Sequence, residues 1–495
     1  MKINDKQKST YLSKTLFMKG MQCHKALYLE KYHPELKDEM DADTKRRLAG
    51  GHEVGEYAMK LFPGGTEVPY EGLDYTEQLT MTQDEIKKKT QTVYEAAFSY
   101  DSIFVKLDIL HHGAQGWEIY EVKASNENKE HYLDDLSLQF YVAINSGLPI
   151  TKVHIVYLNK NYIRKGSIEP PKLFVIKDTT SEVKENQENI KKNIEEIKKM
   201  LLGGQPEIAI GVQCSKPHKC DFWSHCSKHL PENSVMDLCG SKKIKFELHN
   251  EGYYSMDSLP LERLEPRQRF QVEAYVNKKE IVDIAGIKSF LDSLSYPLCF
   301  FDFETFQQPI PPFDGTSPYQ KIPFQYSLHK INRKGDHPEH FEFLVEPGDD
   351  PREEIAIRLL KEIPDNACVL AYHKSFETEI MNNLKSWFAQ YVNKLDRIIA
   401  NMKDLKDPFK KKYLYHWKMQ GSASLKDILP AVVPSLTYTG MQISHGGEAQ
   451  DAYFTMGELE DPEELKRLRT ALLAYCKLDT LAMVEIFEQL TEHVH

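Results

Sequence analysis

Residues 299–306, Cys-Phe-Phe-Asp-Phe-Glu-Thr-Phe, constrain the fold of this chain more than any other stretch. The segment opens with a continuous apolar run, which is typical of a buried strand. It then places Asp302 and Glu304 two residues apart, and side chains at that spacing on a strand point to the same face. Two adjacent carboxylates at the edge of an apolar core repel each other and lose hydration. Both effects cost free energy unless a positive charge between the carboxylates offsets them. The pattern therefore indicates a divalent-cation site, and the simpler alternative is a strand end whose acids face water.

Two later segments offer partners for these acids. Residues 369–377 are predicted to form a strand that turns into a helix carrying Glu377, and residues 474–480 are predicted to be helical. Tyr475 and Asp479 are four residues apart and so share one face of that helix. A two-metal phosphodiesterase needs about four carboxylates around ions ~4 Å apart, together with a residue that positions water. The alternatives are a helix N-terminal charge for Glu377 and a packed helix face for Tyr475.

The first half of the chain contains a second set of chemically suited residues. Residues 103–110 and 116–124 are predicted to form a β-hairpin, with Asp108 on the first strand and Glu121 and Lys123 on one face of the second. Hydrolysis of a phosphodiester needs carboxylates that hold a divalent metal and a cation that orients the attacking water and offsets developing charge. The alternative is a solvated hairpin with an ordinary ion pair.

The order of these residues resembles the RecB-like branch of the PD-(D/E)XK nucleases, over about residues 10–230. In that branch a helix carries a His, here His52, and a later helix carries a Gln, here Gln139. The resemblance implies that Asp108 and Glu121 hold a divalent metal, that Lys123 assists the nucleophile and that His52 supports the site. The family usually has a Tyr four residues after the Gln, whereas this chain has Ala at position 143 and Tyr at position 141.

Cysteines are sparse but unevenly distributed. Eight cysteines in 495 residues are too few for a secreted disulfide scaffold, and Cys214, Cys220 and Cys226 lie within thirteen residues, which indicates metal binding in a reducing compartment. RecB-like nucleases often carry an iron–sulfur cluster with one ligand near the N-terminus and three after the nuclease core. Cys23 and the later three match that layout, so the resemblance implies a [4Fe–4S] cluster. Four thiolates also suit zinc, and four unrelated buried thiols are the remaining alternative.

The second half of the chain, over about residues 295–490, resembles the DEDD 3′–5′ exonucleases of the DnaQ-like, RNase H-like class in its tyrosine subtype. Asp302 and Glu304 match the first motif, Asp479 the last carboxylate and Tyr475 the tyrosine that positions water. Glu377 stands where the family usually has Asp. Asp at position 404 lies where the family has a strand Asp and is a reserve candidate.

These observations predict an α/β protein with two nuclease domains, one restriction-endonuclease-like and one RNase H-like. The expected boundaries are 1–230, a connecting region over 231–294, and 295–495. Helices are expected over 11–31 in pieces, 44–61, 83–98, 132–145, 182–202, 352–362, 377–386 and 461–489. Further strands are expected over 152–158, 298–303, 324–329 and 369–372.

Charge and hydropathy limit the expected partners and cellular location of the protein. The net charge of −11 argues against a polycation that coats nucleic acid, although it leaves room for a nuclease with local basic clusters. No apolar run approaches the ~20 residues of a membrane helix, and the polar residues 1–9 precede no apolar segment. A cytoplasmic protein with no membrane partner is therefore expected.

The function predicted from these features is a nuclease dependent on Mg²⁺ or Mn²⁺, with DNA favoured over RNA and a 3′–5′ exonuclease site in the second half. A role in DNA processing, repair or defence against foreign DNA would follow. The first alternative is a nucleic-acid-binding scaffold in a larger complex, with one or both sites inactive. The second is a zinc-stapled regulatory protein.

Overall fold

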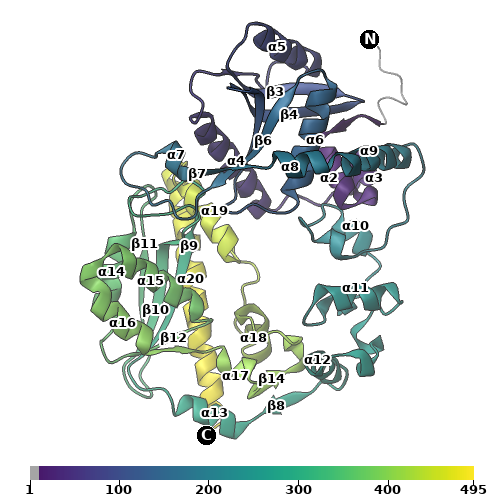
Figure 1. Cartoon of the computed structure of the whole chain (residues 1–495). Helices are drawn as coiled ribbons and strands as arrows, with labels where there is room; N and C mark the ends of the chain where they lie inside the picture. Colours follow the sequence, from purple (N-terminus) through teal and green to yellow (C-terminus); the bar gives the residue numbers. More distant parts are fainter. Residues whose placement is uncertain (1–9, 495) are drawn as a thin grey trace. The chain divides into compact units, whose positions relative to one another are not determined.

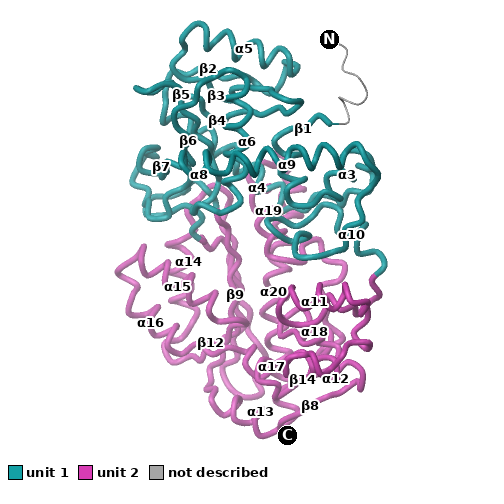
Figure 2. Tube along the Cα trace, turned by 45° about the vertical axis from the view of Figure 1, so that its right-hand side comes forward, with its two compact units in different colours: residues 1–229, 308–320 teal, residues 230–307, 321–495 magenta. Residues whose placement is uncertain are grey.

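Two large β-sheets organise the chain, one in each of its two units (Figure 1, Figure 2). The computed structural model describes residues 10–494, so the polar stretch 1–9 lies outside the described residues. Unit 1 comprises residues 1–229 and Gln308–Gln320, and unit 2 comprises Leu230–Gln307 and Lys321–His495. Residues 231–294, expected as a connecting region, are thus counted in unit 2, and a short segment between two strands of unit 2 is counted in unit 1. Both units mix helices and strands, which confirms the predicted α/β class.

The sheet of unit 1 has the order β2-β3-β4-β5-β6-β7, and β1 pairs with β4. Its strands are β1 (Leu12–Ser13), β2 (Thr66–Glu67), β3 (Thr92–Tyr100), β4 (Ile103–Gly113), β5 (Gly116–Lys123), β6 (Ile150–Leu158) and β7 (Phe174–Asp178). The antiparallel pairing of β4 with β5 confirms the predicted hairpin. On the other side of β5 the pairing with β6 is parallel.

The helices of unit 1 largely follow the hydrophobic pattern of the sequence. They are α2 (Lys14–Gln22), α3 (His24–Tyr32), α4 (Ala42–Met59), α5 (Tyr75–Lys87), α6 (Tyr132–Asn145), α7 (Pro170–Leu173), α8 (Thr180–Glu185), α9 (Gln187–Leu201) and α10 (Trp223–Ser227). Ser13 caps α2 by accepting a hydrogen bond from the N–H of Leu16 at 3.2 Å, as its hydroxyl predicts.

One predicted helix of unit 1 is wrong. Residues 83–98 were expected to be helical, but α5 ends at Lys87 and β3 begins at Thr92. The backbone of Lys89 adopts a positive φ of 61°, which ends the helical path. The Thr-Val-Tyr run that follows fits a pleated, half-buried surface, so β-branched and aromatic packing outweighs the helix propensity of the two alanines in β3.

Both faces of the unit 1 sheet are covered. Apolar residues of α2, α6 and α9, among them Phe17, Leu136 and Ile194, pack on the face that includes Leu107. The opposite face is covered by α4 and by Ile310 of the Gln308–Gln320 segment, which belongs to the same apolar cluster. The Arg164 guanidinium also donates to the carbonyls of residues 311 and 312 at 2.9 and 2.6 Å, which anchors that segment within unit 1.

The main sheet of unit 2 has the order β11-β10-β9-β12-β13. The pairs of β9, β10 and β11 are antiparallel, and the pairs of β9, β12 and β13 are parallel. These strands are β9 (Leu298–Phe306), β10 (Ile322–Ile331), β11 (Glu339–Leu344), β12 (Cys368–Ala371) and β13 (Met402–Asp404), and a separate pair is formed by β8 (Glu280–Val282) and β14 (Leu414–His416). The predicted strands β9, β10 and β12 are confirmed, whereas the short or edge strands β11 and β13 were not expected.

Helices cover both faces of this sheet. The helices of unit 2 are α11 (Lys242–Asn250), α12 (Pro266–Val276), α13 (Ile284–Leu291), α14 (Arg352–Glu362), α15 (Ser375–Trp387), α16 (Val392–Ala400), α17 (Asp407–Lys410), α18 (Leu425–Val432), α19 (Gly446–Met456) and α20 (Pro462–Glu492). In β9, alternate residues enter opposite cores: Phe300 packs in the cluster that includes α20, and Phe301 in the cluster that includes α14 and α15. The long helix α20 lies along β9 and β10 (Figure 1). None of the helices in the described part of the chain is both long and apolar enough to cross a membrane.

Candidate functional site

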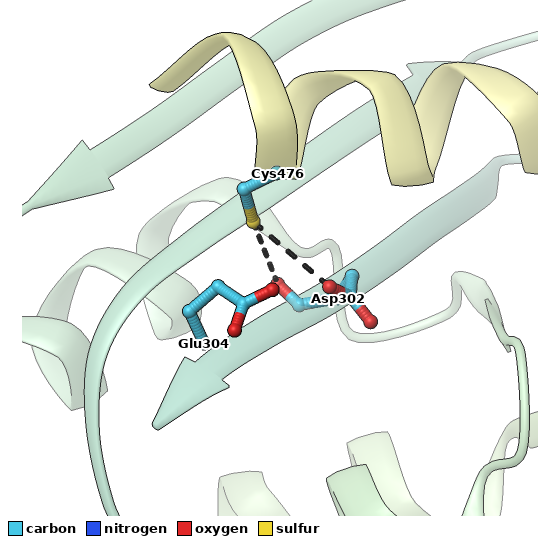
Figure 3. Close-up of side chains that lie close together, drawn as sticks. All are labelled: Asp302, Glu304 and Cys476. Carbon is cyan, nitrogen blue, oxygen red and sulfur yellow. Dashed lines mark hydrogen bonds between the residues drawn. The ribbon is translucent and has the colours of Figure 1, made fainter. Parts of the chain in front are cut away.

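The acids of β9 lie where the strand pattern places them. Asp302 and Glu304 point to the same side of β9, toward Cys476 of α20 (Figure 3). One ligand atom from each of these three residues lies within 4.8 Å of the others. The Cys476 thiol lies 4.0 Å from the carbonyl oxygen and 3.9 Å from Oδ2 of Asp302. This group can hold a metal ion, and Glu304 is only 7% exposed, so its acid does not simply face water.

Glu377 and Asp479 complete a buried set of four carboxylates, here called the acid cluster. Burial raises the pKa of Asp302 well above its usual range, and the charges of Asp479, Glu377 and Glu304 raise it further. Burial likewise raises the pKa of Glu377 to about 8 and that of Asp479 to about 6. Glu377 is 1% exposed, and its Oε2 is buried without a hydrogen-bond partner. Acids forced together with unused oxygens fit a hard divalent cation, which prefers oxygen ligands.

Two tyrosines and a lysine surround Asp479. Tyr438 Oη donates a hydrogen bond of 2.5 Å to Asp479 Oδ1, and Tyr475 also hydrogen-bonds to this carboxylate. The Lys426 ammonium lies 5.6 Å from the ring centroid of Tyr438 and 5.8 Å from that of Tyr475. Its charge acts against the burial that raises the pKa values of Glu304 and Asp479. Lys426 thus supplies a positive charge that acts on both acids.

Asp404 lies close to the acid cluster, but its carboxylate binds backbone N–H groups. Its Oδ1 accepts hydrogen bonds from the backbone N–H groups of His373 and Lys406, both at 3.0 Å. These bonds hold His373 at a positive φ of 76°, in the turn between β12 and α15. The Asp404 charge also raises the pKa of Glu377, after burial. Asp404 therefore shapes the turn that presents Glu377.

Unit 2 contains two cavities, one of which includes acids of the cluster. One of about 330 Å³ is lined by Asp302, Lys321, Tyr372, His373, Ser375, Phe376, Glu377 and Glu379. Another, of about 500 Å³, lies beside α20 and is lined by Met441, Gln442, Glu463, Lys466, Arg467, Thr470, Ala471 and Ala474. The first joins two of the four acids to aromatic rings, and the second carries two cations one turn or more before Tyr475.

The predicted residues of unit 1 also come together, with two additions. The Lys123 ammonium lies 2.8 Å from Glu121 Oε1 and 2.5 Å from Oδ2 of Asp135 on α6. Lys14, at the start of α2, contacts the same Glu121 oxygen at 2.8 Å. Asp108 Oδ2 accepts the N–H of residue 122 at 2.7 Å, and burial together with the charge of Glu121 raises the pKa of Asp108 well above its usual range. Lys14, Asp108, Glu121, Lys123 and Asp135 are called the charge cluster below.

The other two predicted residues of unit 1 differ in their placement. Gln139 is fully buried and donates from Nε2 to Asp135 Oδ1 at 2.9 Å, so it borders the charge cluster. His52 lies on α4 and is exposed. Within residues 10–494 no hydrogen bond or ion pair joins His52 to the charge cluster. The free Oε2 of Glu121, which is buried without a partner, gives the cluster an unused oxygen that fits a divalent cation.

The four cysteines that the sequence singled out lie near enough to influence one another's ionisation. Burial raises the pKa values of Cys214, Cys220 and Cys226, that of Cys220 to about 11, and charges on neighbouring cysteines of the set raise them further. Cys23 contributes to all three shifts. The loop that holds the later three is fixed to α2 by Lys19, whose ammonium lies 2.7 Å from the Asp221 carboxylate. Across the described residues these sulfurs do not form a group within 4.8 Å, the spacing seen for Asp302, Glu304 and Cys476.

Several residues of these sites were not found from the sequence. Tyr438, Cys476, Lys14 and Asp135 were not predicted, although each contacts a predicted residue. A spacing signal existed for Asp135, which lies four residues before Gln139 on the same helix face. Tyr438 lies outside any helix or strand, where no periodicity applies.

Comparisons with known proteins add one match. A family model described as "Domain of unknown function (DUF2779)" matches residues 299–424, from β9 to the residue before α18. The matched part includes Asp302, Glu304 and Glu377 and ends before Tyr475 and Asp479. No curated protein matches the chain.

Proposed function

We propose that this chain is a metal-dependent nuclease with two sites, and that the acid cluster of unit 2 is a 3′–5′ exonuclease site. The observation that carries the proposal is the convergence of four carboxylates from β9, α15 and α20 in one buried place. Buried like charges are costly, so a set of four is retained where a counter-charge binds. DNA is the favoured substrate.

In unit 2, Asp302, Glu304, Glu377 and Asp479 would hold Mg²⁺ or Mn²⁺. Bound divalent ions would polarise the phosphodiester and lower the pKa of an attacking water. Tyr475 would orient that water, because its hydroxyl already reaches the Asp479 carboxylate. Lys426, near the rings of both tyrosines, would offset the negative charge of a substrate phosphate.

In unit 1, Asp108 and Glu121 would hold a divalent metal and Lys123 would assist the nucleophile. The contacts of Lys123 with Glu121 and Asp135 support this role, because they place its ammonium beside the free Oε2 oxygen of Glu121. Gln139 would orient the Asp135 carboxylate. The exposure of His52 leaves it a role at the rim, through contact with substrate.

The cysteine site would hold a [4Fe–4S] cluster. A single zinc ion binds sulfur at about 2.3 Å, which brings its four sulfurs within about 4 Å of each other. The one-plus-three order of the four cysteines supports the iron–sulfur cluster, and a zinc ion is the alternative. A cluster would hold the N-terminal helix pair and the loop after α9 together across nearly 200 residues of sequence.

The test is a cleavage assay on end-labelled DNA and RNA with Mg²⁺ or Mn²⁺, using the full chain. Asp302→Asn should abolish 3′–5′ degradation, and Glu121→Gln should abolish whatever cleavage then remains. Glu354→Gln is the control, because this exposed acid of unit 2 lies on α14, away from the cavity, and pairs with Arg358. Absence of cleavage in every wild-type condition would contradict the proposal.

A second candidate is a nucleic-acid-binding scaffold in which one site is inactive. The ion pairs that engage both lysines of the charge cluster favour it for unit 1. This scaffold would bind labelled DNA with the same affinity with and without divalent metal. A nuclease site would instead bind more tightly with Ca²⁺, which holds substrate without supporting efficient cleavage.

A further inference from the structure

Two lysines from distant parts of the chain contact the same pair of carboxylates in unit 1. The Lys14 ammonium lies 2.8 Å from Glu121 Oε1 and 3.8 Å from Asp135 Oδ1. The Lys123 ammonium lies 2.8 Å from the same Glu121 oxygen and 2.5 Å from Asp135 Oδ2. Each ammonium therefore bridges both acids, and the four groups alternate in charge around a ring.

The two lysines differ in exposure. The Lys14 side chain is 25% exposed and that of Lys123 is 16% exposed, whereas Glu121 and Asp135 are 2% and 9% exposed. Lys14 enters from the first turn of α2, whose start is fixed by the Ser13 cap. Over its whole side chain, Lys14 is thus the more exposed of the two lysines.

The charges of the cluster are nearly balanced without a metal. Asp108, Glu121 and Asp135 contribute three carboxylates against two ammonium groups. A divalent cation that enters between Asp108 and Glu121 therefore meets two cations already attached to Glu121. One of them must weaken its contact with Glu121, and Lys14 is held less firmly, because its second contact, with Asp135, is 3.8 Å long against 2.5 Å for Lys123.

We propose that Lys14 is the phosphate-binding lysine of unit 1. In the metal-free protein its ammonium forms an ion pair with Glu121. When a divalent cation binds Glu121 and displaces this ammonium, Lys14 contacts a phosphate of the nucleic-acid backbone. This inference rests on the nuclease function proposed above. Lys123 keeps its ion pair with Asp135 during this exchange. Lys14 therefore binds phosphate, while Lys123 assists the nucleophile. An ammonium group suits this exchange because it is a compact point charge on a flexible stem.

Metal binding gives the first test, which is independent of catalysis. Mn²⁺ is titrated by calorimetry into the full chain carrying Asp302→Asn and Asp479→Asn, so that heat from the acid cluster is removed. Lys14→Met in that background should tighten Mn²⁺ binding about tenfold or more, because a competing charge is lost. Lys14→Arg should bind Mn²⁺ as the parent does. Asp108→Asn should abolish the binding.

Nucleic-acid binding and cleavage give the second test. Lys14→Met should raise KM, or the Kd for an oligonucleotide with Ca²⁺, about tenfold, and should change kcat less than Lys123→Met does. Lys14→Arg should restore the affinity. Lys88→Met is the matched control, since Lys88 pairs with a glutamate at 2.7 Å on the surface of the same unit.

The outcomes separate this inference from the nuclease function. Unchanged or weaker Mn²⁺ binding by folded Lys14→Met would overturn the inference, even if the chain cleaves DNA. Unchanged oligonucleotide affinity would overturn it as well. Absence of cleavage together with tighter Mn²⁺ binding and weaker oligonucleotide binding would support Lys14 as proposed while contradicting catalysis by unit 1.

Discussion

Tyr438 Oη donates a hydrogen bond of 2.5 Å to Asp479 Oδ1, which gives the last acid of the cluster a second tyrosine besides Tyr475. Tyr475 belongs to α20, four residues before Asp479, whereas Tyr438 comes from the segment between α18 and α19. Burial, and then the charge of Asp479, raises the pKa of both tyrosines far above the usual range. The buried surroundings therefore favour the protonated, donor form of both phenols.

Tyr438→Phe should lower exonuclease activity less than Tyr475→Phe does. Loss of Tyr475 would remove the water-positioning hydroxyl, and such groups typically contribute 10²–10⁴-fold. Loss of Tyr438 removes one hydrogen bond to a charged acceptor, worth about 1.5–3 kcal/mol, so a decrease in kcat of about ten- to hundredfold is expected. Single-turnover digestion of a labelled oligonucleotide measures both. Equal losses would mean that Tyr438, and not only Tyr475, contacts the water.

The metal-free protein should lose stability between pH 7 and 8.5. The pKa of Glu377 is raised to about 8 by burial, so the folded state holds a proton there that the unfolded state has released above about pH 4.5. Stability then falls as pH rises toward 8, by up to about 1.4 kcal/mol per pH unit for one such group. Below pH 6.5 the buried His329 and the half-buried His340, whose pKa values burial lowers to about 4, act in the opposite direction, which sets the lower limit of the window.

Thermal unfolding with EDTA at pH 7 and 8.5 measures this decline, and excess Mn²⁺ should abolish it because the cation replaces the proton. A midpoint that is independent of pH in EDTA would contradict the shared burial of these acids.

Glu377→Gln should stabilise the metal-free protein at pH 8.5 and abolish exonuclease activity at the same time. The amide fills the same space without a charge, so it removes repulsion from the acid cluster and one oxygen ligand together. Glu354→Gln, at an exposed acid on α14, should change neither property. Calorimetry at pH 8.5 and the cleavage assay measure the two effects. A destabilised Glu377→Gln would indicate that the carboxylate is paired rather than strained.

Much of this arrangement was predictable where periodicity and chemistry coincide. The apolar run of β9 and the i, i+2 spacing place Asp302 and Glu304 on one face, and the i, i+4 spacing of α20 places Tyr475 beside Asp479. Alternation and turn chemistry likewise give the β4–β5 hairpin with Asp108 and Glu121. In each case the geometry of one regular element determines which side chains share a face.

Contacts between elements were less accessible. Lys14 reaches Glu121 across 107 positions, and Tyr438 reaches Asp479 from an irregular segment, so no local period signals either contact. Asp404 was predicted as a reserve metal ligand because the resembled family has a strand Asp at this position. In the structure its Oδ1 accepts hydrogen bonds from two backbone N–H groups. The turn at His373 determines whether the Asp404 carboxylate meets backbone N–H groups or a cation. A sequence pattern does not specify the conformation of that turn.

Cys23→Ser should impair unit 1 while leaving the exonuclease activity of unit 2 within about twofold. Helix α2 carries Lys14 at its first residue and is followed directly by Cys23, so nine residues, about 13 Å of helix, separate the cysteine site from the charge cluster. Loss of one thiolate ligand of the proposed iron–sulfur cluster should free that end of α2 and displace Lys14 from Glu121.

Iron content and absorbance at about 400 nm report the iron–sulfur cluster. Cleavage by the Asp302→Asn chain should fall at least tenfold on adding Cys23→Ser. Cys239→Ser, a free half-buried thiol of unit 2, is the control. Full iron loading with unchanged cleavage in Cys23→Ser would show that α2 keeps its place without this ligand.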